Sequence, residues 1–185
     1  MIKNILKEIS ENFNKLSEQS SENIINSANI MIDALKNGKK IMFCGNGGSA
    51  ADSQHLAAEL VGRYRKDRDP IAAVALTTDT SSITAISNDY SYDEIFTRQI
   101  KALGKEGDVL YAISTSGKSQ NVIKGIKTAK SMKIKVIGIS GNDPGIMSDI
   151  CDALISVPSE RPDRIQEMHI AVGQIICELI ENSFT

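Results

Sequence analysis

Hydrophobic residues recur at helical spacing over residues 2–36 of the chain. Isoleucine, leucine, phenylalanine and methionine stand three or four positions apart, first over Ile2–Leu16 and then over Ile24–Leu35. Because such side chains share one face of an α-helix, the spacing predicts two amphipathic helices, broken in the polar run Ser17–Ser21. Asn37-Gly38 follows the second stretch, and glycine is the usual residue just past a helix end.

After these helices, short apolar runs alternate with helical stretches. The apolar runs predict five strands, at Ile41–Cys44, Ile71–Leu76, Val109–Ile113, Lys135–Ile139 and Ala153–Val157. Helices are expected over Ser49–Tyr64, Ser81–Ser87, Tyr92–Leu103, Gln120–Met132, Pro144–Ser148 and Arg161–Asn182. Continuous apolar strands joined by helices are typical of a parallel sheet that is covered on both faces.

We therefore expect a single α/β domain over residues 1–185, with a doubly wound five-stranded parallel sheet flanked by helices and with two N-terminal helices. The apolar faces within residues 1–37 would pack on the core or on a neighbouring subunit. In a sheet of this kind, ligands bind outside the carboxyl ends of the strands.

Composition narrows the classes of partner. The net charge is −2, aromatic residues make up 4% and tryptophan is absent, which argues against a nucleic-acid surface. No apolar run approaches the roughly 20 residues that span a bilayer, and the N-terminus lacks a signal-peptide core. Cys44, Cys151 and Cys177 lack C-x-x-C spacing, so we expect buried free thiols. These features predict a cytoplasmic protein without a membrane or nucleic-acid partner.

Two predicted strands run directly into loops of small residues that precede helices. The loops are Gly45–Ala50 and Ser114–Ser119. Backbone N–H groups, short hydroxyls and a helix N-terminus gathered at one place suit a phosphate or a sugar hydroxyl. The sequence therefore favours an enzyme that acts on a phosphorylated small molecule.

Each loop also has an alternative interpretation. Gly45–Ala50 fits the dinucleotide pattern G-x-G-x-x-A, but the acidic residue expected about 20 positions later is not in its place. Ser116–Ser119 ends like a phosphate-binding P-loop, yet that pattern requires glycine where Ala112 stands. The serines could also serve only to cap a helix, although one or two hydroxyls would be enough for that.

A pair of polar residues follows the glycine loop on its helix. His55 and Glu59 are four positions apart and therefore share a face, and Arg63 is expected one turn further on. This spacing suits two metal ligands, or a base beside the group that orients it. The alternative is a solvated polar face. We expect the pair to lie one or two turns from the bound ligand, which favours a functional role.

Six segments, in order along the chain, resemble the phosphoheptose isomerases of the sugar-isomerase (SIS) domain superfamily. They are Cys44–Asp52, His55–Tyr64, Leu76–Thr80, Asn88–Tyr90, Ile113–Gly117 and Arg164–His169. The resemblance implies conversion of sedoheptulose 7-phosphate into D-glycero-D-manno-heptose 7-phosphate, the first step towards activated heptoses for bacterial glycans. It also implies a homotetramer with active sites at subunit interfaces, often with zinc.

The resemblance further implies roles for particular residues. Glu59 would be the catalytic base, and Gln174 occupies the position of a second catalytic group. The phosphate would be held by Ser114, Thr115, Ser116 and Ser119. The sugar would contact Asn46, Gly47, Gly48, Ser49, Arg63, Asn88, Asp89, Asp163 and Gln166. One zinc ion per subunit would be bound by His55, Glu59, Gln166 and Gln174.

Gln174 departs from the family pattern. The family usually has a histidine eight residues after the glutamine of its Arg-Ile-Gln-Glu motif, as a metal ligand and proton donor, and this chain has Gln174 there. A carboxamide does not carry protons near neutral pH, and it binds zinc weakly. His169 points about 140° away from Gln174 around a helix, so we interpret His169 as structural.

Three readings follow from this departure: a weakened isomerase, an isomerase rescued by metal or water, and a non-catalytic SIS protein that binds a sugar phosphate and a protein partner. Because Glu59 and the segment Gly62–Arg65 are retained, the sequence favours an enzyme. Isomerisation of a different phosphosugar would differ only in the length of the substrate.

Overall fold

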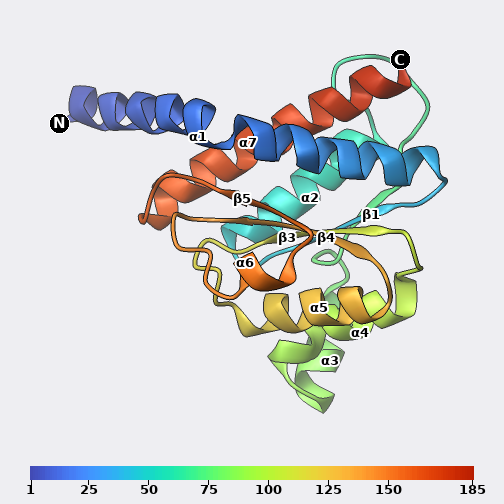
Figure 1. The fold of residues 1–185 in the computed structure, drawn as a ribbon. Helices are drawn as coiled ribbons and strands as arrows, with labels where there is room; N and C mark the ends of the chain where they lie inside the picture. The colour runs from blue at the N-terminus through green and yellow to red at the C-terminus, as the bar shows by residue number, and fades with distance from the viewer.

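The computed structural model describes residues 1–185, and at its centre five parallel strands form one sheet (Figure 1). The strands are β1 (Ile41–Cys44), β2 (Ala73–Ala75), β3 (Val109–Ile113), β4 (Lys135–Ser140) and β5 (Ala153–Ser156). Their order across the sheet is β2-β1-β3-β4-β5. The predicted doubly wound parallel sheet is confirmed, and β1 and β3 have the predicted bounds.

Helices cover both faces of the sheet. They are α1 (Ile2–Lys36), α2 (Gly48–Val61), α3 (Thr80–Asp89), α4 (Ile95–Leu103), α5 (Gln120–Ser131), α6 (Met147–Ile150) and α7 (Pro162–Phe184). A single 3₁₀ turn at Tyr92–Glu94 precedes α4. None of these helices is both long enough and apolar enough to cross a membrane.

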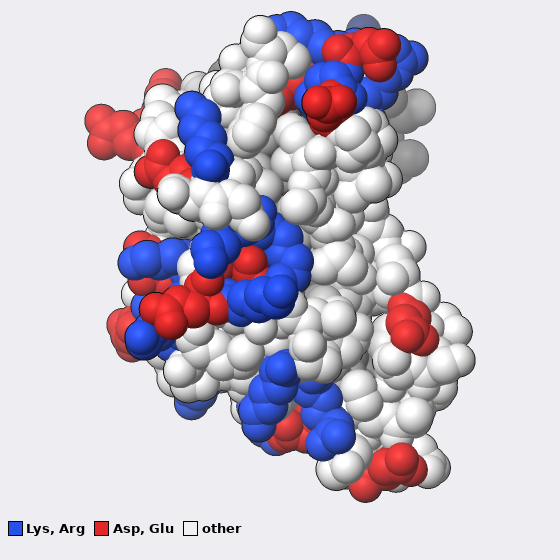
Figure 2. All heavy atoms as spheres, turned by 90° about the vertical axis from the view of Figure 1, so that its right-hand side faces the viewer, with Lys and Arg blue, Asp and Glu red and all other residues white.

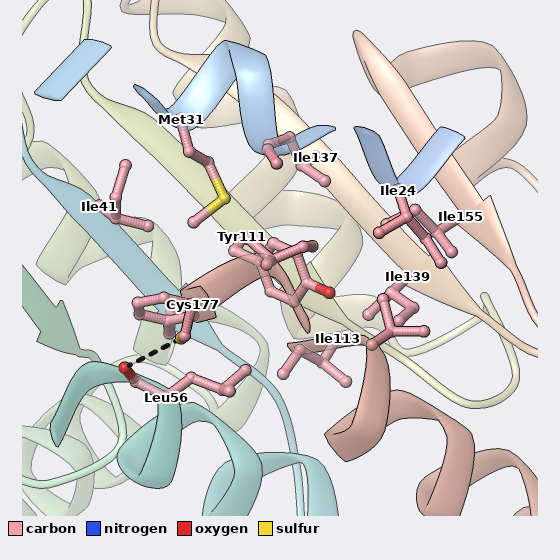
Figure 3. Close-up of a cluster of buried hydrophobic side chains, with 14 of the residues drawn as sticks. Ile24, Met31, Ile41, Leu56, Tyr111, Ile113, Ile137, Ile139, Ile155 and Cys177 are labelled. Carbon is pink, nitrogen blue, oxygen red and sulfur yellow. Dashed lines mark hydrogen bonds between the residues drawn. The ribbon is translucent and has the colours of Figure 1, made fainter. Parts of the chain in front are cut away.

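Alternate residues of each strand face two separate cores, as expected for a sheet covered on both sides. Phe43 and Tyr111 belong to the core beneath α1, α2 and α7. Met42 and Leu110 belong to a second core against α4 and α5. Figure 3 shows the first core, where Met31 of α1 approaches the sheet residue Tyr111.

The N-terminal segment is one helix, so the prediction of two helices broken near Ser17–Ser21 is wrong. Ser17 and Ser21 donate their hydroxyls to backbone carbonyls of the preceding turn, at 2.8 and 2.6 Å, which lets the helix continue. The hydroxyl of Ser20 donates to the carbonyl of Ser156 at 2.9 Å, at the end of β5. The polar run therefore contacts the sheet through Ser20 and does not interrupt the helix.

Helix α2 ends at Val61, three residues before the predicted end at Tyr64. Gly62 follows the last helical residue, and the backbone N–H of Tyr64 is bonded to the carboxylate of Glu181 in α7 instead of to a carbonyl of its own helix. This partner lies 117 residues away in the sequence, so local spacing could not reveal it.

Helices α2 and α7 pack side by side and run in the same direction. Three contacts define their register: Gly48 with Gln166, Leu56 with Gly173, and Tyr64 with Glu181. The residue numbers in these pairs differ by 118, 117 and 117, so the register holds from one end of α2 to the other. A side chain at Gly173 would bring Cβ to 2.5 Å from Leu56, so glycine is what permits this close approach.

Candidate functional site

The loops that follow β1 and β3 meet at the carboxyl edge of the sheet. The two strands are neighbours, and Cys44 at the end of β1 lies opposite Ala112 of β3. From β1 the chain passes through α2 to β2 on one side, whereas β3 lies on the other side of β1. Open α/β sheets bind ligands where the strand order reverses in this way. The structure thus brings the two predicted loops to one place.

A pair of asparagines joins the glycine loop to the first turn of α5. Asn46 donates its side-chain amide to Asn121 at 2.8 Å, and Asn121 donates its own to Asn46 at 2.8 Å. The hydroxyl of Tyr92 also donates to Asn46, at 2.9 Å. Asn121 is buried and Tyr92 lies in the turn before α4, and neither was identified from the sequence. Nothing in their local spacing distinguishes them from surface polar residues.

The serine-rich loop after β3 presents hydroxyls at the start of α5. Ser114 is buried and donates to the hydroxyl of Ser119 at 3.2 Å. Ser116 is exposed, and its hydroxyl accepts the backbone N–H of Lys118 at 3.2 Å. Thr115 is half-buried between them. Hydroxyls and free N–H groups at a helix N-terminus suit an anion such as a phosphate.

Gly117 determines the shape of this loop. Its φ is +63°, and a Cβ there would lie 2.1 Å from the carbonyl oxygen of Pro144. Only glycine accepts both conditions. Beside the loop opens a polar cavity of about 370 Å³ that is bounded by Thr115, Ser116 and Asn142 among others.

His55 and Glu59 form the predicted pair on α2. His55 Nε2 lies 2.9 Å from Glu59 Oε1, and the two side chains are 47% and 21% exposed. An imidazole nitrogen facing a carboxylate oxygen is suited to holding a metal ion or to orienting a general base.

Glu59 lies well beyond the start of α2, where the helix meets the glycine loop. Glu59 follows Gly48 by eleven residues, which is about 16 Å along a helix axis. Arg68, whose guanidinium donates to the carbonyl of Glu59 at 2.9 Å, also lines a cavity with Lys39 and Ala72, just before β1 and β2. The pair therefore lies towards the amino edge of the sheet. The expected distance of one or two turns is wrong for Glu59, which is three turns along.

The two predicted glutamines of α7 take different positions along α2. The amide of Gln166 lies 2.6 Å from where a Cβ of Gly48 would be, so it sits against the glycine loop. By the register of the two helices, Gln174 is level with Ala57, between His55 and Glu59. The two glutamines are about 12 Å apart along the axis, and α7 therefore offers one carboxamide to each end of α2.

The donors around His55 fit zinc in part. An imidazole nitrogen and a carboxylate oxygen are ordinary zinc ligands, and carboxamide oxygens are weaker ones. No group of three or more His, Cys, Asp or Glu side chains gathers in the single chain. His55 and Glu59 would hold the ion, with Gln174, level with Ala57 in the register of the two helices, as an additional donor.

Four other predicted residues lie apart from the pair. Asn88 and Asp89 are exposed at the end of α3, where the amide of Asn88 donates to Asp89 at 2.9 Å. Arg63 is exposed, but it follows the end of α2 and so does not share the helical face of Glu59 as expected. Ser49 is buried beneath Gly45, where a Cβ would lie 2.7 Å from that of Ser49.

Asp163 lies in the first turn of α7 and is exposed. Its carboxylate accepts from Arg161 at 2.7 Å and from Arg164 at 3.1 Å. The hydrogen bond from Arg161, with help from Arg164, lowers the pKa of Asp163 to about 2. The ionised carboxylate is 51% exposed, so it can still accept a hydroxyl group beside these ion pairs.

Two further titratable groups have buried polar atoms without hydrogen-bond partners. Both ring nitrogens of His169 lack a hydrogen-bond partner, and burial lowers the pKa of this histidine to about 4. His169 is thus neutral and enclosed, in agreement with a structural role. Asp52, one turn before His55, has a buried unpartnered oxygen, and burial raises its pKa to about 6 despite the opposing effect of His55.

Comparisons with known proteins agree with this architecture. The family model described as "SIS domain" matches residues 5–141. A phosphoheptose isomerase from Nitratiruptor sp. is 52% identical, with 100% of both chains covered. A solved phosphoheptose isomerase from Neisseria gonorrhoeae has a TM-score of 0.93 at 42% identity and covers 98% of this chain and 97% of that chain.

The chain belongs to the phosphoheptose isomerase family of SIS-domain proteins. A second solved member, from Francisella tularensis, has a TM-score of 0.94 at 32% identity, with 98% of this chain and 96% of that chain covered. The likeness to this family extends over the whole chain, from the N-terminal helix to α7, so the resemblance drawn from six short segments is confirmed.

The raised pKa of Asp52 predicts that the substitution D52N increases the stability of the fold, by an amount that depends on pH. Because the folded state binds this proton more tightly than the unfolded state, ionisation costs stability as pH rises from about 4 to about 6. A shift of two pKa units corresponds to about 3 kcal/mol in the free energy of unfolding. Because solvent screens a half-exposed group, we reduce this to about 1–2 kcal/mol. At pH 8, D52N should therefore melt about 3–6 °C higher than the unaltered chain. At pH 4, the two should have the same melting temperature.

Melting followed by circular dichroism at both pH values measures this difference. Asp67 is exposed and its carboxylate has no hydrogen-bond partner, so D67N serves as the control and should shift the melting temperature at neither pH. A D52N variant that melts lower than the unaltered chain at pH 8 would show that ionised Asp52 makes a favourable contact instead.

Proposed function

We propose that this chain isomerises D-sedoheptulose 7-phosphate to D-glycero-D-manno-heptose 7-phosphate, as the first step towards activated heptoses for lipopolysaccharide or capsule. The observation that carries the proposal is the His55–Glu59 pair, held at 2.9 Å on the helix that begins at the glycine loop. Family membership at 52% identity over the full chain supports the substrate class.

The serine-rich loop is proposed to hold the phosphate. Its hydroxyls and N–H groups at the start of α5 are oriented before the ligand arrives, by Gly117 and by the hydrogen bond between Ser114 and Ser119. Binding energy from this remote group fixes the sugar without taking part in the chemistry. The asparagine pair would contact sugar hydroxyls at the same edge of the sheet.

Glu59 is proposed to move the proton. Ketose–aldose isomerisation transfers a proton between C1 and C2 through a cis-enediol, which requires a carboxylate near these carbons. His55 holds one carboxylate oxygen of Glu59 and leaves the other free for the substrate. A proton must also move between the two substrate oxygens. Gln174, as a carboxamide, would orient the carbonyl oxygen without exchanging a proton readily, so water would carry this proton.

Zinc is the proposed cofactor, with one ion per subunit. When bound, it would polarise the substrate oxygens as a Lewis acid. His55 and Glu59 supply its two strongest protein ligands, and the carboxamide of Gln174 would be a third. Gln166 of the same chain lies about 12 Å further along the axis, so a carboxamide from Gln166 would have to come from a neighbouring subunit. Because carboxamides bind zinc weakly, we expect lower affinity than in a relative with histidine at position 174.

The active site is proposed to be shared between subunits of a homotetramer. Within one chain Glu59 lies about 16 Å along the α2 axis from Gly48, whereas the serine loop lies at the carboxyl edge of the sheet, where α2 begins. The N-terminal part of α1 extends beyond the body of the molecule (Figure 1) and exposes Ile2, Ile5 and Leu6. An apolar groove of about 300 Å³ between α1 and α7 offers a matching surface. A neighbouring chain on these surfaces would bring the two halves together.

The remaining surface agrees with a small-molecule substrate in the cytoplasm. Basic and acidic side chains are interspersed on the face drawn in Figure 2, without the single-sign field that nucleic acids attract. All three cysteines are free, as suits a reducing compartment.

Replacing Glu59 by glutamine tests the proposed base. E59Q keeps the shape of the side chain but cannot accept the proton, so kcat should fall by about 10²–10⁴ while KM changes little. Formation of the aldose from sedoheptulose 7-phosphate, with and without added zinc, is the measurement. Glu106 is 68% exposed and pairs only with Lys133, so E106Q is the control and should keep full activity.

Turnover in E59Q equal to that of the unaltered chain would contradict the role of Glu59. If the unaltered chain shows no turnover, even with zinc and after Gln174→His, the isomerase proposal fails. Thermal stabilisation by the sugar phosphate in that case would favour the second candidate, a binding SIS protein, for which Gln174 is the specific observation.

Restoring a histidine at position 174 should raise activity. Because imidazole both binds zinc well and exchanges protons near neutral pH, we expect Q174H to raise kcat by about tenfold or more. Zinc retained after gel filtration should also increase. Asn182→His, at an exposed position of the same helix outside the α1–α7 groove, controls for the addition of an imidazole to α7. Equal or lower kcat in Q174H would contradict a proton-donor role for this position.

A further inference from the structure

A buried ion pair lies at the end of α2, next to Glu59. Arg68 Nε lies 3.2 Å from Glu181 Oε1, and the two side chains are only 3% and 2% exposed. Removing two charges from water is costly, and such a pair is stable only when additional hydrogen bonds satisfy the remaining polar atoms. In this chain those hydrogen bonds go to the backbone on both sides of the C-terminus of α2.

Glu181 binds the segment that follows α2. Its carboxylate accepts three successive backbone N–H groups, from Tyr64 at 3.1 Å, Arg65 at 3.0 Å and Lys66 at 3.1 Å. Burial raises the pKa of Glu181, but the three N–H donors and Arg68 outweigh it and hold the pKa below its ordinary value. An ionised carboxylate therefore fixes the path of the chain as it leaves the helix.

Arg68 binds the last turn of α2 itself. Its Nη2 donates to the carbonyl of Glu59 at 2.9 Å, and its Nη1 donates to the carbonyl of Leu60 at 2.9 Å. The last carbonyls of a helix have no partner within the helix, and the carbonyl of Leu60 also accepts the backbone N–H of Ile71 at 3.0 Å. Without Arg68, the partly buried carbonyl of Glu59 would therefore lose its hydrogen-bond partner. One guanidinium thus holds the backbone of the residue that carries the base.

We infer that Arg68 and Glu181 form a positioning pair for the reaction, which fixes the backbone of Glu59 and the exposed segment that follows it. This inference rests on the proposed role of Glu59. Neither residue is assigned a contact with the sugar, because both side chains are nearly buried and their polar groups are bonded to each other and to the backbone. A displacement of about 1 Å at a reacting group costs on the order of 10²-fold in rate. The phosphate is held elsewhere, so the pair governs kcat rather than KM.

Glu181→Gln tests the inference. We expect kcat to fall about tenfold or more with KM within about twofold, at a temperature where circular dichroism shows the variant folded. Hydrogen exchange at the amides of residues 64–66 should become faster, because a neutral amide is a weaker acceptor. E178Q is the matched control on the same helix: Glu178 is 41% exposed and bonds only Arg65, so kcat and exchange should stay unchanged.

The possible outcomes distinguish a positioning role of Arg68 and Glu181 from a purely structural one. A folded E181Q with a lower melting temperature but unchanged kcat would reduce the pair to a structural role and overturn the inference. Unchanged exchange at residues 64–66 would overturn it as well. If E181Q does not fold, the double variant R68Q/E181Q removes both charges together, leaves no lone buried ion, and is measured in the same way. If the unaltered chain has no turnover, the proposed function fails, whereas exchange still reports on the pair.

Discussion

Helices α2 and α7 run in the same direction, and their packing through Leu56 and Gly173 is the constraint on which the rest of the structure depends. A single methyl group on Gly173 would lie 2.5 Å from Leu56, so the two axes are as close as their side chains allow. This contact fixes the register by which Gln166 reaches the glycine loop, Gln174 lies level with Ala57, and Glu181 meets the end of α2.

The same register explains why the functional groups divide into two sets. α2 begins at the carboxyl edge of the sheet, where Asn46, Asn121 and the serine loop gather, and it carries Glu59 towards the amino edge. The helix is rigid, so its own length places Glu59 about 16 Å along the axis from Gly48 at the carboxyl edge. On the proposed roles of these groups, each chain would carry two incomplete sites that a neighbouring copy would complete. The exposed apolar residues of α1 are consistent with such an assembly.

The sheet and the loops were predictable because their signals are local. Ile41–Cys44 and Val109–Ile113 are uninterrupted apolar runs, and the loops after them contain the glycines and hydroxyls that an anion requires. The sequence-based predictions are wrong where a contact with a residue distant in the sequence overrides the local pattern of polar and apolar residues. Ser20 bonds a carbonyl 136 residues away, so a serine run that looks like a helix break is a contact with β5. Arg68, Asn121 and Glu181 have no distinguishing local spacing, since their meaning depends on partners in other elements.

Mixing two inactive variants tests the central claim, that Glu59 of one chain acts on a sugar held by the serine loop of another. E59Q and the double variant S114A/S119A are each expected to be inactive alone, one without the base and the other without the phosphate grip. If the site is shared, random mixing by unfolding and refolding the two together should make about a quarter of the sites intact and restore activity. A mixture that forms hetero-oligomers but stays as inactive as its components would contradict the account.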